Sequence, residues 1–87
     1  MNPFAANLRN LRLEKGMTQE QSAEKLGVSA QSVSRWETGA TLPDVLMLPD
    51  IAKLYGVLVD DLFKPAVRGY DNNAQRLMAV YEHTHKP

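Results

Sequence analysis

The sequence predicts a small all-α protein, and three observations lead to this prediction. Residues suited to cap helices recur along the 87 residues, and a glycine follows several of the capped segments. Apolar residues within these segments repeat at the three- and four-residue spacings of one helix face. Proline and glycine separate one segment from the next. A chain of this length can bury only a thin core, which indicates one small domain.

The first helix is expected from residue 3 to about residue 15. Asn2 can cap it, with Pro3 at the first helical position, where a missing N–H loses no hydrogen bond. Gly16 is placed to end the helix. Arg12 lies just beside the apolar stripe. That stripe consists of Phe4, Leu8 and Leu11.

The second helix is expected between Thr18 and Gly27. Thr18 is a good N-cap, and Gln21, three residues later, completes a capping box. Gly27 allows a sharp turn after the helix. The inward face holds Ser22, Ala23 and Leu26.

The third helix is expected over residues 29–38, capped by Ser29 and ended by Gly39. One side holds Val33, Trp36 and Glu37, and the tryptophan is expected to pack inward. The opposite side holds Gln31, Ser34, Arg35 and Thr38. Arginine can bind O6 and N7 of guanine in the major groove, and glutamine can bind N6 and N7 of adenine. The alternative is an ordinary solvated face, although such a face more often carries glutamate and lysine.

The run T-Q-x-x-x-A-x-x-L-G-V-S-x-x-x-V-S-x-W-E-x-G, followed by L-P-D, resembles the Cro/repressor-type (xenobiotic-response-element family) helix-turn-helix DNA-binding domain. The resemblance extends from about Leu8 to Phe63. It implies a compact five-helix domain whose second motif helix, at about 29–38, lies in the major groove of DNA. It also implies a partly buried structural ion pair between Arg12 and Glu37.

The docking that this resemblance implies yields two sets of expected DNA contacts. The base contacts are Ala30, Gln31, Ser34 and Arg35. The phosphate contacts are Gln19, Ser29, Ser32, Thr38 and Thr41. Gln19 opens the second helix, where exposed backbone N–H groups also favour an anion. The alternative interpretation of Gln19 is a solvated residue in the first turn of the helix.

Beyond Gly39 the sequence predicts a loop over residues 40–48 and a fourth helix from Pro49 to Tyr55. The inward stripe of this fourth helix is Leu48, Ile51, Ala52 and Tyr55. A short last helix follows at 59–63, with Leu62 and Phe63 as anchors. Leu58 stands where relatives commonly have a capping serine. An apolar residue there suggests a contact with another chain.

The expected DNA-binding domain spans residues 1–63. Residues 64–87 are expected to form a linker, an amphipathic C-terminal helix at about 72–82 and a tail. The apolar stripe of that helix is Ala74, Leu77, Met78 and Tyr81. It can fold back on the domain or pair with its copy in a dimer. The candidate dimer contacts are therefore Leu58, Leu77, Met78 and Tyr81. The ending is also compatible with a further domain or partner protein at the C-terminus.

Composition excludes several function classes. The chain has no cysteine, hence no disulfide or thiolate metal site, which fits a reducing cytoplasm. The resemblance implies that this cytoplasm is of the bacterial or phage type. No apolar run is long enough for a membrane span or signal peptide. His83 and His85 have no third ligand nearby, so no metal is expected. No catalytic motif is present, and we expect neither enzyme activity nor a cofactor.

The sequence therefore predicts a sequence-specific DNA-binding transcriptional regulator that acts as a repressor. It should bind double-stranded DNA as a homodimer, because one such domain reads few base pairs. Ten basic and ten acidic residues cancel, and this zero net charge counts mildly against nucleic-acid binding. The alternative is a protein-interaction module with the same fold. An antitoxin, which binds both a toxin and its own operator, lies between the two.

Overall fold

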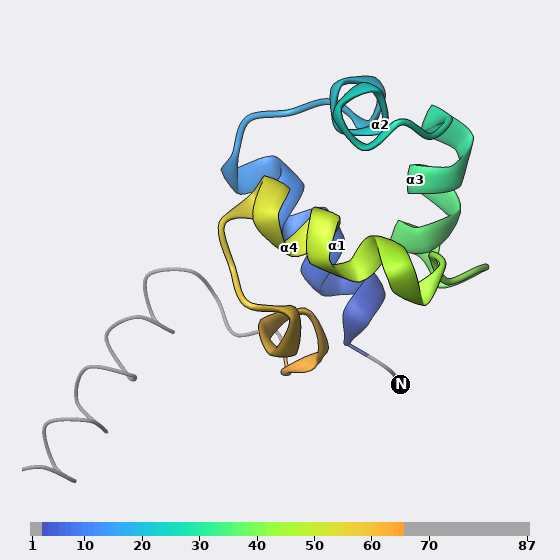
Figure 1. The fold of residues 1–87 in the computed structure, drawn as a ribbon. Coiled ribbons are helices and arrows are strands. Elements are labelled where there is room, and N and C mark those ends of the chain that lie inside the picture. Colours follow the sequence, from blue (N-terminus) through green and yellow to red (C-terminus); the bar gives the residue numbers. More distant parts are fainter. Residues whose placement is uncertain (1–2, 66–87) are drawn as a thin grey trace, which may run out of the picture.

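The computed structural model describes residues 3–65, and this part of the chain is all-helical (Figure 1). Its four α-helices are α1 (Phe4–Glu14), α2 (Gln19–Leu26), α3 (Ala30–Thr38) and α4 (Leu48–Tyr55). Two 3₁₀ helices, η1 (Val45–Met47) and η2 (Val59–Phe63), precede and follow α4. The helix expected at 72–82, its apolar stripe and the two histidines lie outside the described residues.

The helix-turn-helix is formed by α2 and α3, and the expected caps determine its ends. The Thr18 hydroxyl accepts a hydrogen bond from the Gln21 amide at 3.0 Å, and the Gln21 side chain accepts one from the Thr18 amide at 2.9 Å. Gly27 ends α2 with a φ of 72°, a conformation that only glycine adopts without strain. Ser29 then caps α3. These predicted caps are confirmed, and they set the sharp corner between the two helices.

One core holds the helices in place. The helix α3 packs against both α1 and α2, while α4 packs against α2 and η2. The buried apolar residues are Phe4, Leu8, Ala23, Val33, Trp36, Ile51, Ala52, Tyr55 and Leu62. Ile51 and Leu62 are fully buried, and each such side chain contributes about 1.5–3 kcal/mol. The predicted inward packing of Trp36 is confirmed, so α3 presents its opposite side to solvent.

Two helix boundaries and one helix type differ from the prediction. Pro3 is the N-cap of α1 rather than its first helical residue, so the helix begins at Phe4. The fourth helix begins at Leu48, one residue before the predicted start, with Pro49 in its first turn. The last helix, η2, is a 3₁₀ helix, and the five-helix expectation becomes four α-helices with two 3₁₀ helices.

Of the two predicted anchors of the last helix, Leu62 is fully buried, whereas 44% of the Phe63 surface is exposed. A 3₁₀ helix has three residues per turn, so Phe63 lies about a third of a turn away from the side that Leu62 buries. The Phe63 ring instead stacks on the Phe4 ring, with centroids 5.2 Å apart.

Asn7 joins α1 to the end of η2. This side chain is 8% exposed, and its Nδ2 donates to the backbone carbonyls of Leu62 at 2.9 Å and Lys64 at 2.6 Å. The bonds satisfy carbonyls that a helix end would otherwise leave unpaired. A buried asparagine therefore fixes the last element of the fold.

Ser22 is fully buried and takes part in a polar pair inside the core. Its hydroxyl accepts a hydrogen bond from the Tyr55 hydroxyl at 3.0 Å and donates to the Met17 sulfur at 3.4 Å. This arrangement links α2 to α4. Burial raises the pKa of the Tyr55 phenol, because the charged phenolate is poorly solvated there.

Tyr55→Phe should lower the free energy of unfolding at pH 7 by about 1–2 kcal/mol, since the Ser22 hydroxyl loses its buried donor. The free energy of unfolding of the wild type should fall as the pH rises above the ordinary pKa of tyrosine. Only the unfolded chain releases the phenolic proton readily at such a pH, because the pKa of Tyr55 is raised in the folded protein. Urea unfolding at neutral and alkaline pH measures both effects. If the free energy of unfolding of Tyr55→Phe falls by the same amount at alkaline pH, groups other than Tyr55 cause the fall.

Candidate nucleic-acid interface

The solvent side of α3 is the candidate reading face. Gln31, Arg35 and Thr38 are exposed, while Ala30 and Ser34 are half-buried on the same side. The opposite side is buried through Val33, Trp36 and Glu37. The exposed groups are a guanidinium, an amide and hydroxyls, which can donate to or accept from base edges.

The small hydroxyl residues around α3 are already hydrogen-bonded within the protein. The Ser29 hydroxyl caps α3 by accepting from the Ser32 amide at 3.1 Å, and the two serine hydroxyls lie 2.9 Å apart. The Thr38 hydroxyl donates to the Arg35 carbonyl at 3.1 Å. Thr41 is exposed in the following loop. Each bonded hydroxyl would have to rotate, or share its hydrogen bond, to donate to a phosphate.

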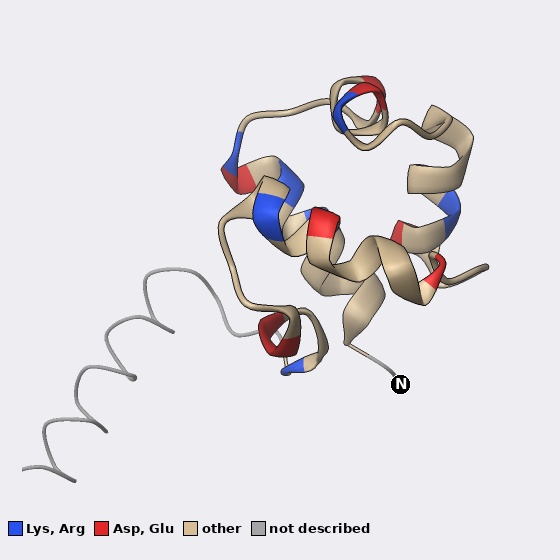
Figure 2. Ribbon diagram, in the orientation of Figure 1, with Lys and Arg blue, Asp and Glu red and all other residues tan. Residues whose placement is uncertain are grey.

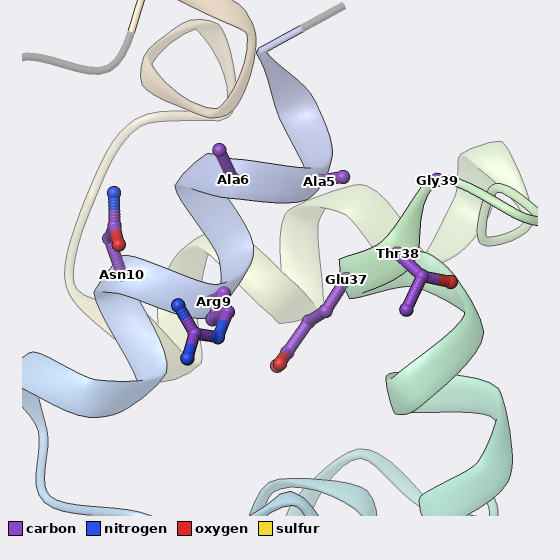
Figure 3. A pocket seen from close by; sticks show the side chains of 7 residues that line it. All are labelled: Ala5, Ala6, Arg9, Asn10, Glu37, Thr38 and Gly39. Carbon is purple, nitrogen blue, oxygen red and sulfur yellow. The ribbon is translucent and has the colours of Figure 1, made fainter.

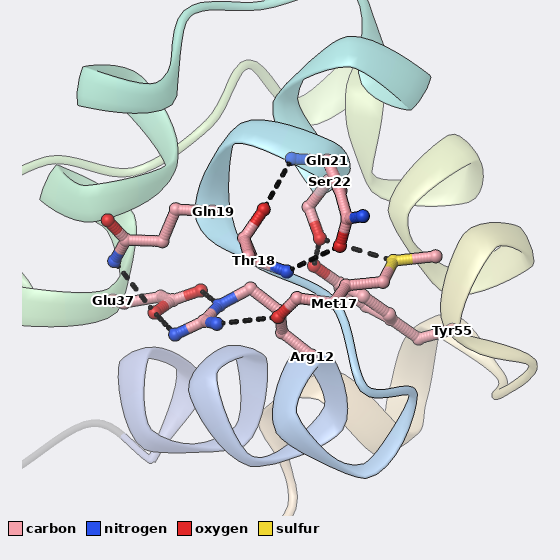
Figure 4. A network of polar contacts seen from close by, with 8 residues as sticks. All are labelled: Arg12, Met17, Thr18, Gln19, Gln21, Ser22, Glu37 and Tyr55. Carbon is pink, nitrogen blue, oxygen red and sulfur yellow. Dashed lines mark hydrogen bonds and ion pairs between the residues drawn. The ribbon is translucent and has the colours of Figure 1, made fainter.

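The ion pair implied by the resemblance is present and ties α1 to α3 (Figure 4). Arg12 Nε donates to Glu37 Oε2 at 2.7 Å, and Arg12 Nη2 donates to Glu37 Oε1 at 3.0 Å. A third bond runs from Arg12 Nη1 to the Met17 carbonyl at 2.8 Å. The two side chains are 10% and 2% exposed. The hydrogen bond with Glu37 raises the pKa of the Arg12 guanidinium, so the pair stays charged.

Gln19 is joined to the same pair, a contact that the sequence prediction missed. Its Nε2 donates to Glu37 Oε1 at 3.2 Å. A glutamine amide has two N–H donors, so one donor remains for an external acceptor. The side chain is half-buried at the start of α2. The carboxylate thus orients the Gln19 amide with its NH₂ group inward, and no local sequence pattern indicates this.

The loop after α3 is apolar rather than basic. Leu42, Val45 and Leu46 are 67%, 69% and 81% exposed. The charged residue of this loop is Asp44, which caps η1 by accepting from the Leu46 amide at 2.8 Å. Residues 40–47 contain no lysine or arginine. Any cation that supports phosphate binding therefore comes from another element.

Two other kinds of site are absent from residues 3–65. Within this range no helix is long and apolar enough to cross a membrane. Nor does this range hold three histidine, cysteine or acidic side chains grouped as metal ligands.

The sequence profile of the helix-turn-helix family matches residues 8–62. The HTH-type transcriptional activator BcrR of Enterococcus faecalis is 42% identical over 59 residues, which cover 68% of this chain but 29% of that protein. The cryptic phage CTXphi transcriptional repressor RstR of Vibrio cholerae is 26% identical over 84 residues, which cover 97% of this chain and 76% of that protein.

Solved structures with the same fold include a regulator and an enzyme. A transcriptional regulator from Listeria innocua superposes with a TM-score of 0.67 at 29% identity, over 93% of this chain and 78% of that one. The hydroxypropylphosphonic acid epoxidase from S. wedmorenis superposes with a TM-score of 0.65 at 29% identity, over 76% of this chain but 35% of the enzyme.

Proposed function

The chain belongs to the helix-turn-helix family, and we propose that it is a sequence-specific DNA-binding transcriptional regulator that acts as a repressor. The observation that carries the proposal is the exposed side of α3, held by a capped corner with α2 and a buried ion pair behind it. In this proposal α3 lies in the major groove. Arg35 binds guanine, Gln31 binds adenine, and Ala30 and Ser34 contact neighbouring base edges.

The proposed phosphate contacts surround this helix. They are Gln19, Ser29, Ser32, Thr38 and Thr41. The free N–H of Gln19 and the exposed amides at the start of α2 suit a phosphate oxygen. The likeness to the repressor RstR, at 26% identity, extends over 97% of this chain, whereas the likeness to the activator BcrR, at 42% identity, covers 68% of it. In this proposal the regulator works in the cytoplasm, on bacterial or phage DNA.

We further propose that two copies bind one operator. A single α3 reads few base pairs, so two half-sites are needed for useful specificity. Leu58 is an exposed apolar side chain, 70% accessible, at the start of η2. In this proposal residues 1–63 form the DNA-binding domain, and residues 64–87 supply the further dimer contacts Leu77, Met78 and Tyr81.

Leu58→Ser should shift the protein towards monomer without loss of stability. The backbone at Leu58 already has the extended N-cap conformation, with φ −81° and ψ 154°, which suits a capping serine. The change therefore removes exposed apolar surface and adds a capping oxygen. Sedimentation equilibrium and thermal unfolding measure the two effects. A wild type that is monomeric at high concentration would contradict the dimer, and an unchanged mass in Leu58→Ser would exclude this contact.

A second candidate function is a protein-interaction module. The exposed apolar side chains of Leu42, Val45 and Leu46, which lie within five residues of one another in the sequence, favour it, because exposed apolar surface can mark a contact with another protein. In the antitoxin version of this candidate, the chain binds both DNA and a protein. A measurement of DNA binding distinguishes the proposed regulator from an interaction module that no longer binds DNA.

Salt dependence tests the proposed function directly. Fluorescence anisotropy of a labelled random-sequence duplex, measured from low to physiological salt, should show binding that weakens steeply as salt rises. Neutralised phosphates release counterions, which causes this dependence. No binding at low salt, or binding that salt does not change, would contradict the proposal and leave the interaction module.

A further inference from the structure

The proposed DNA face is poor in positive charge. Within α3 the one cation is Arg35, as Figure 2 shows. Arg12 is buried against Glu37, and residues 40–47 have no cation. Affinity for DNA depends strongly on lysine and arginine near the phosphates. A second cation close to α3 would therefore have a large effect on binding.

A groove next to the C-terminal end of α3 contains such a cation. It lies between α1 and α3, has a volume of about 420 Å³ and is shown in Figure 3. Small residues, namely Ala5, Ala6 and Gly39, line part of it, and Arg9, Asn10 and Thr38 add polar groups. Thr38 belongs to both this groove and the proposed reading face. The groove and the reading face are thus continuous.

The small residues explain why the groove is open. Ala5 and Ala6 lie one helical turn before Arg9 and Asn10, on the same side of α1. A Cβ added at Gly39 would lie 3.9 Å from the Cβ of Ala5, so the end of α3 approaches α1 closely at this point. Longer side chains at the two alanines would fill the space in front of Arg9.

The charge of Arg9 is available to an external anion. Arg9 is exposed, and none of the carboxylates described in the structure lies within ion-pair distance of it. The Glu37 carboxylate also lines the groove, but Arg12 binds both of its oxygens and Gln19 binds one. The positive charge of Arg12 balances the negative charge of the Glu37 carboxylate, so this carboxylate repels an incoming anion only weakly.

We propose that this groove binds a backbone phosphate of double-stranded DNA, with Arg9 as the cation and Asn10 and Thr38 as hydrogen-bond donors. The inference rests on the proposed function and adds α1 to the DNA interface. Arg9 supplies the charge, and the Asn10 amide supplies two donors. The Thr38 hydroxyl must rotate away from the Arg35 carbonyl to donate to the phosphate. Such a contact positions the protein on DNA without reading bases.

Arg9→Ala tests the proposal in the full chain. Binding to a selected operator duplex and to a random duplex should weaken by the same factor. The slope of log K against log salt should become shallower by about 0.9, the value for one phosphate contact. Arg9→Lys should restore most of the slope, because lysine also binds phosphate as a point charge.

Two further variants make the test specific to the groove. Lys53→Ala removes an exposed cation that lines a different hollow, beside α4, and should leave the slope unchanged. Ala6→Leu keeps every charge but fills the groove, and should weaken binding to both duplexes. Ala6 is exposed, so its thermal unfolding should match the wild type.

The outcomes separate this inference from the proposed function. An unchanged salt slope in Arg9→Ala, with wild-type DNA binding intact, overturns the groove contact alone. Weakening confined to the selected duplex assigns Arg9 to base reading and also overturns it. If Lys53→Ala reduces the slope of log K against log salt as much as Arg9→Ala does, the effect comes from total charge, which would contradict a phosphate site in the groove. A wild type that binds no DNA overturns both the inference and the proposed function.

Discussion

Replacing Arg12 with alanine should lower the free energy of unfolding by about 3–5 kcal/mol, because it breaks a buried ion pair. The Glu37 side chain is 2% exposed and would keep only the Gln19 amide as a partner. The Met17 carbonyl would lose its donor as well. An uncompensated buried carboxylate is the main cause of the expected loss.

Urea unfolding measures this loss, and a double-mutant cycle assigns it to the pair. Arg12→Ala combined with Glu37→Ala should destabilise the protein less than the sum of the two single changes. Arg9→Ala is the matched control, since Arg9 lies three residues earlier on α1 and is exposed. It should change stability by less than about 0.5 kcal/mol. Strict additivity in the cycle would show that Arg12 and Glu37 do not stabilise each other.

Replacing Arg35 with alanine should reduce binding to the selected operator by about 1–3 kcal/mol and relax the preference at one base pair of each half-site. Arg35 is exposed in the last turn of α3, so the fold should survive the change. Its planar guanidinium matches the two acceptors of guanine in the major groove. Binding to random DNA should fall less, because only the specific complex contains that base contact.

Gln19→Ala is the comparison that separates reading from positioning. Gln19 stands at the start of α2, where only phosphates should be in reach, so binding to selected and random duplexes should weaken by similar factors. Because Gln19 also donates to Glu37, thermal unfolding must be measured alongside. Equal weakening of all sequences by Arg35→Ala would make Arg35 a phosphate contact and contradict the proposed docking of α3.

The helix-turn-helix could be predicted from the sequence because its determinants are local. Thr18 and Ser29 bond to amides three residues away, and Gly27 and Gly39 adopt positive φ next to the helices that they end. The period of the α-helix likewise predicts the buried side of α3, including Trp36. Signals of this kind do not depend on how the rest of the chain packs.

The contacts that depend on packing could not be predicted in this way. Gln19 bonds to Glu37 across 18 residues, and Tyr55 bonds to Ser22 across 33. Nothing in the local sequence indicates either partner. The groove in front of Arg9 arises only when the end of α3 approaches two alanines of α1. The stacking of the Phe63 ring on Phe4, across 59 residues, likewise depends on how α1 and η2 pack.

Selection of bound duplexes from a random pool tests directly whether the exposed side of α3 reads DNA sequence. We expect one enriched operator with two inverted half-sites, whose centres lie about 34 Å apart. Each half-site should contain a guanine that Arg35→Ala no longer selects. Bound DNA that stays as random as the starting pool, or an enriched sequence that Arg35→Ala selects unchanged, would show that this side of α3 does not read DNA sequence.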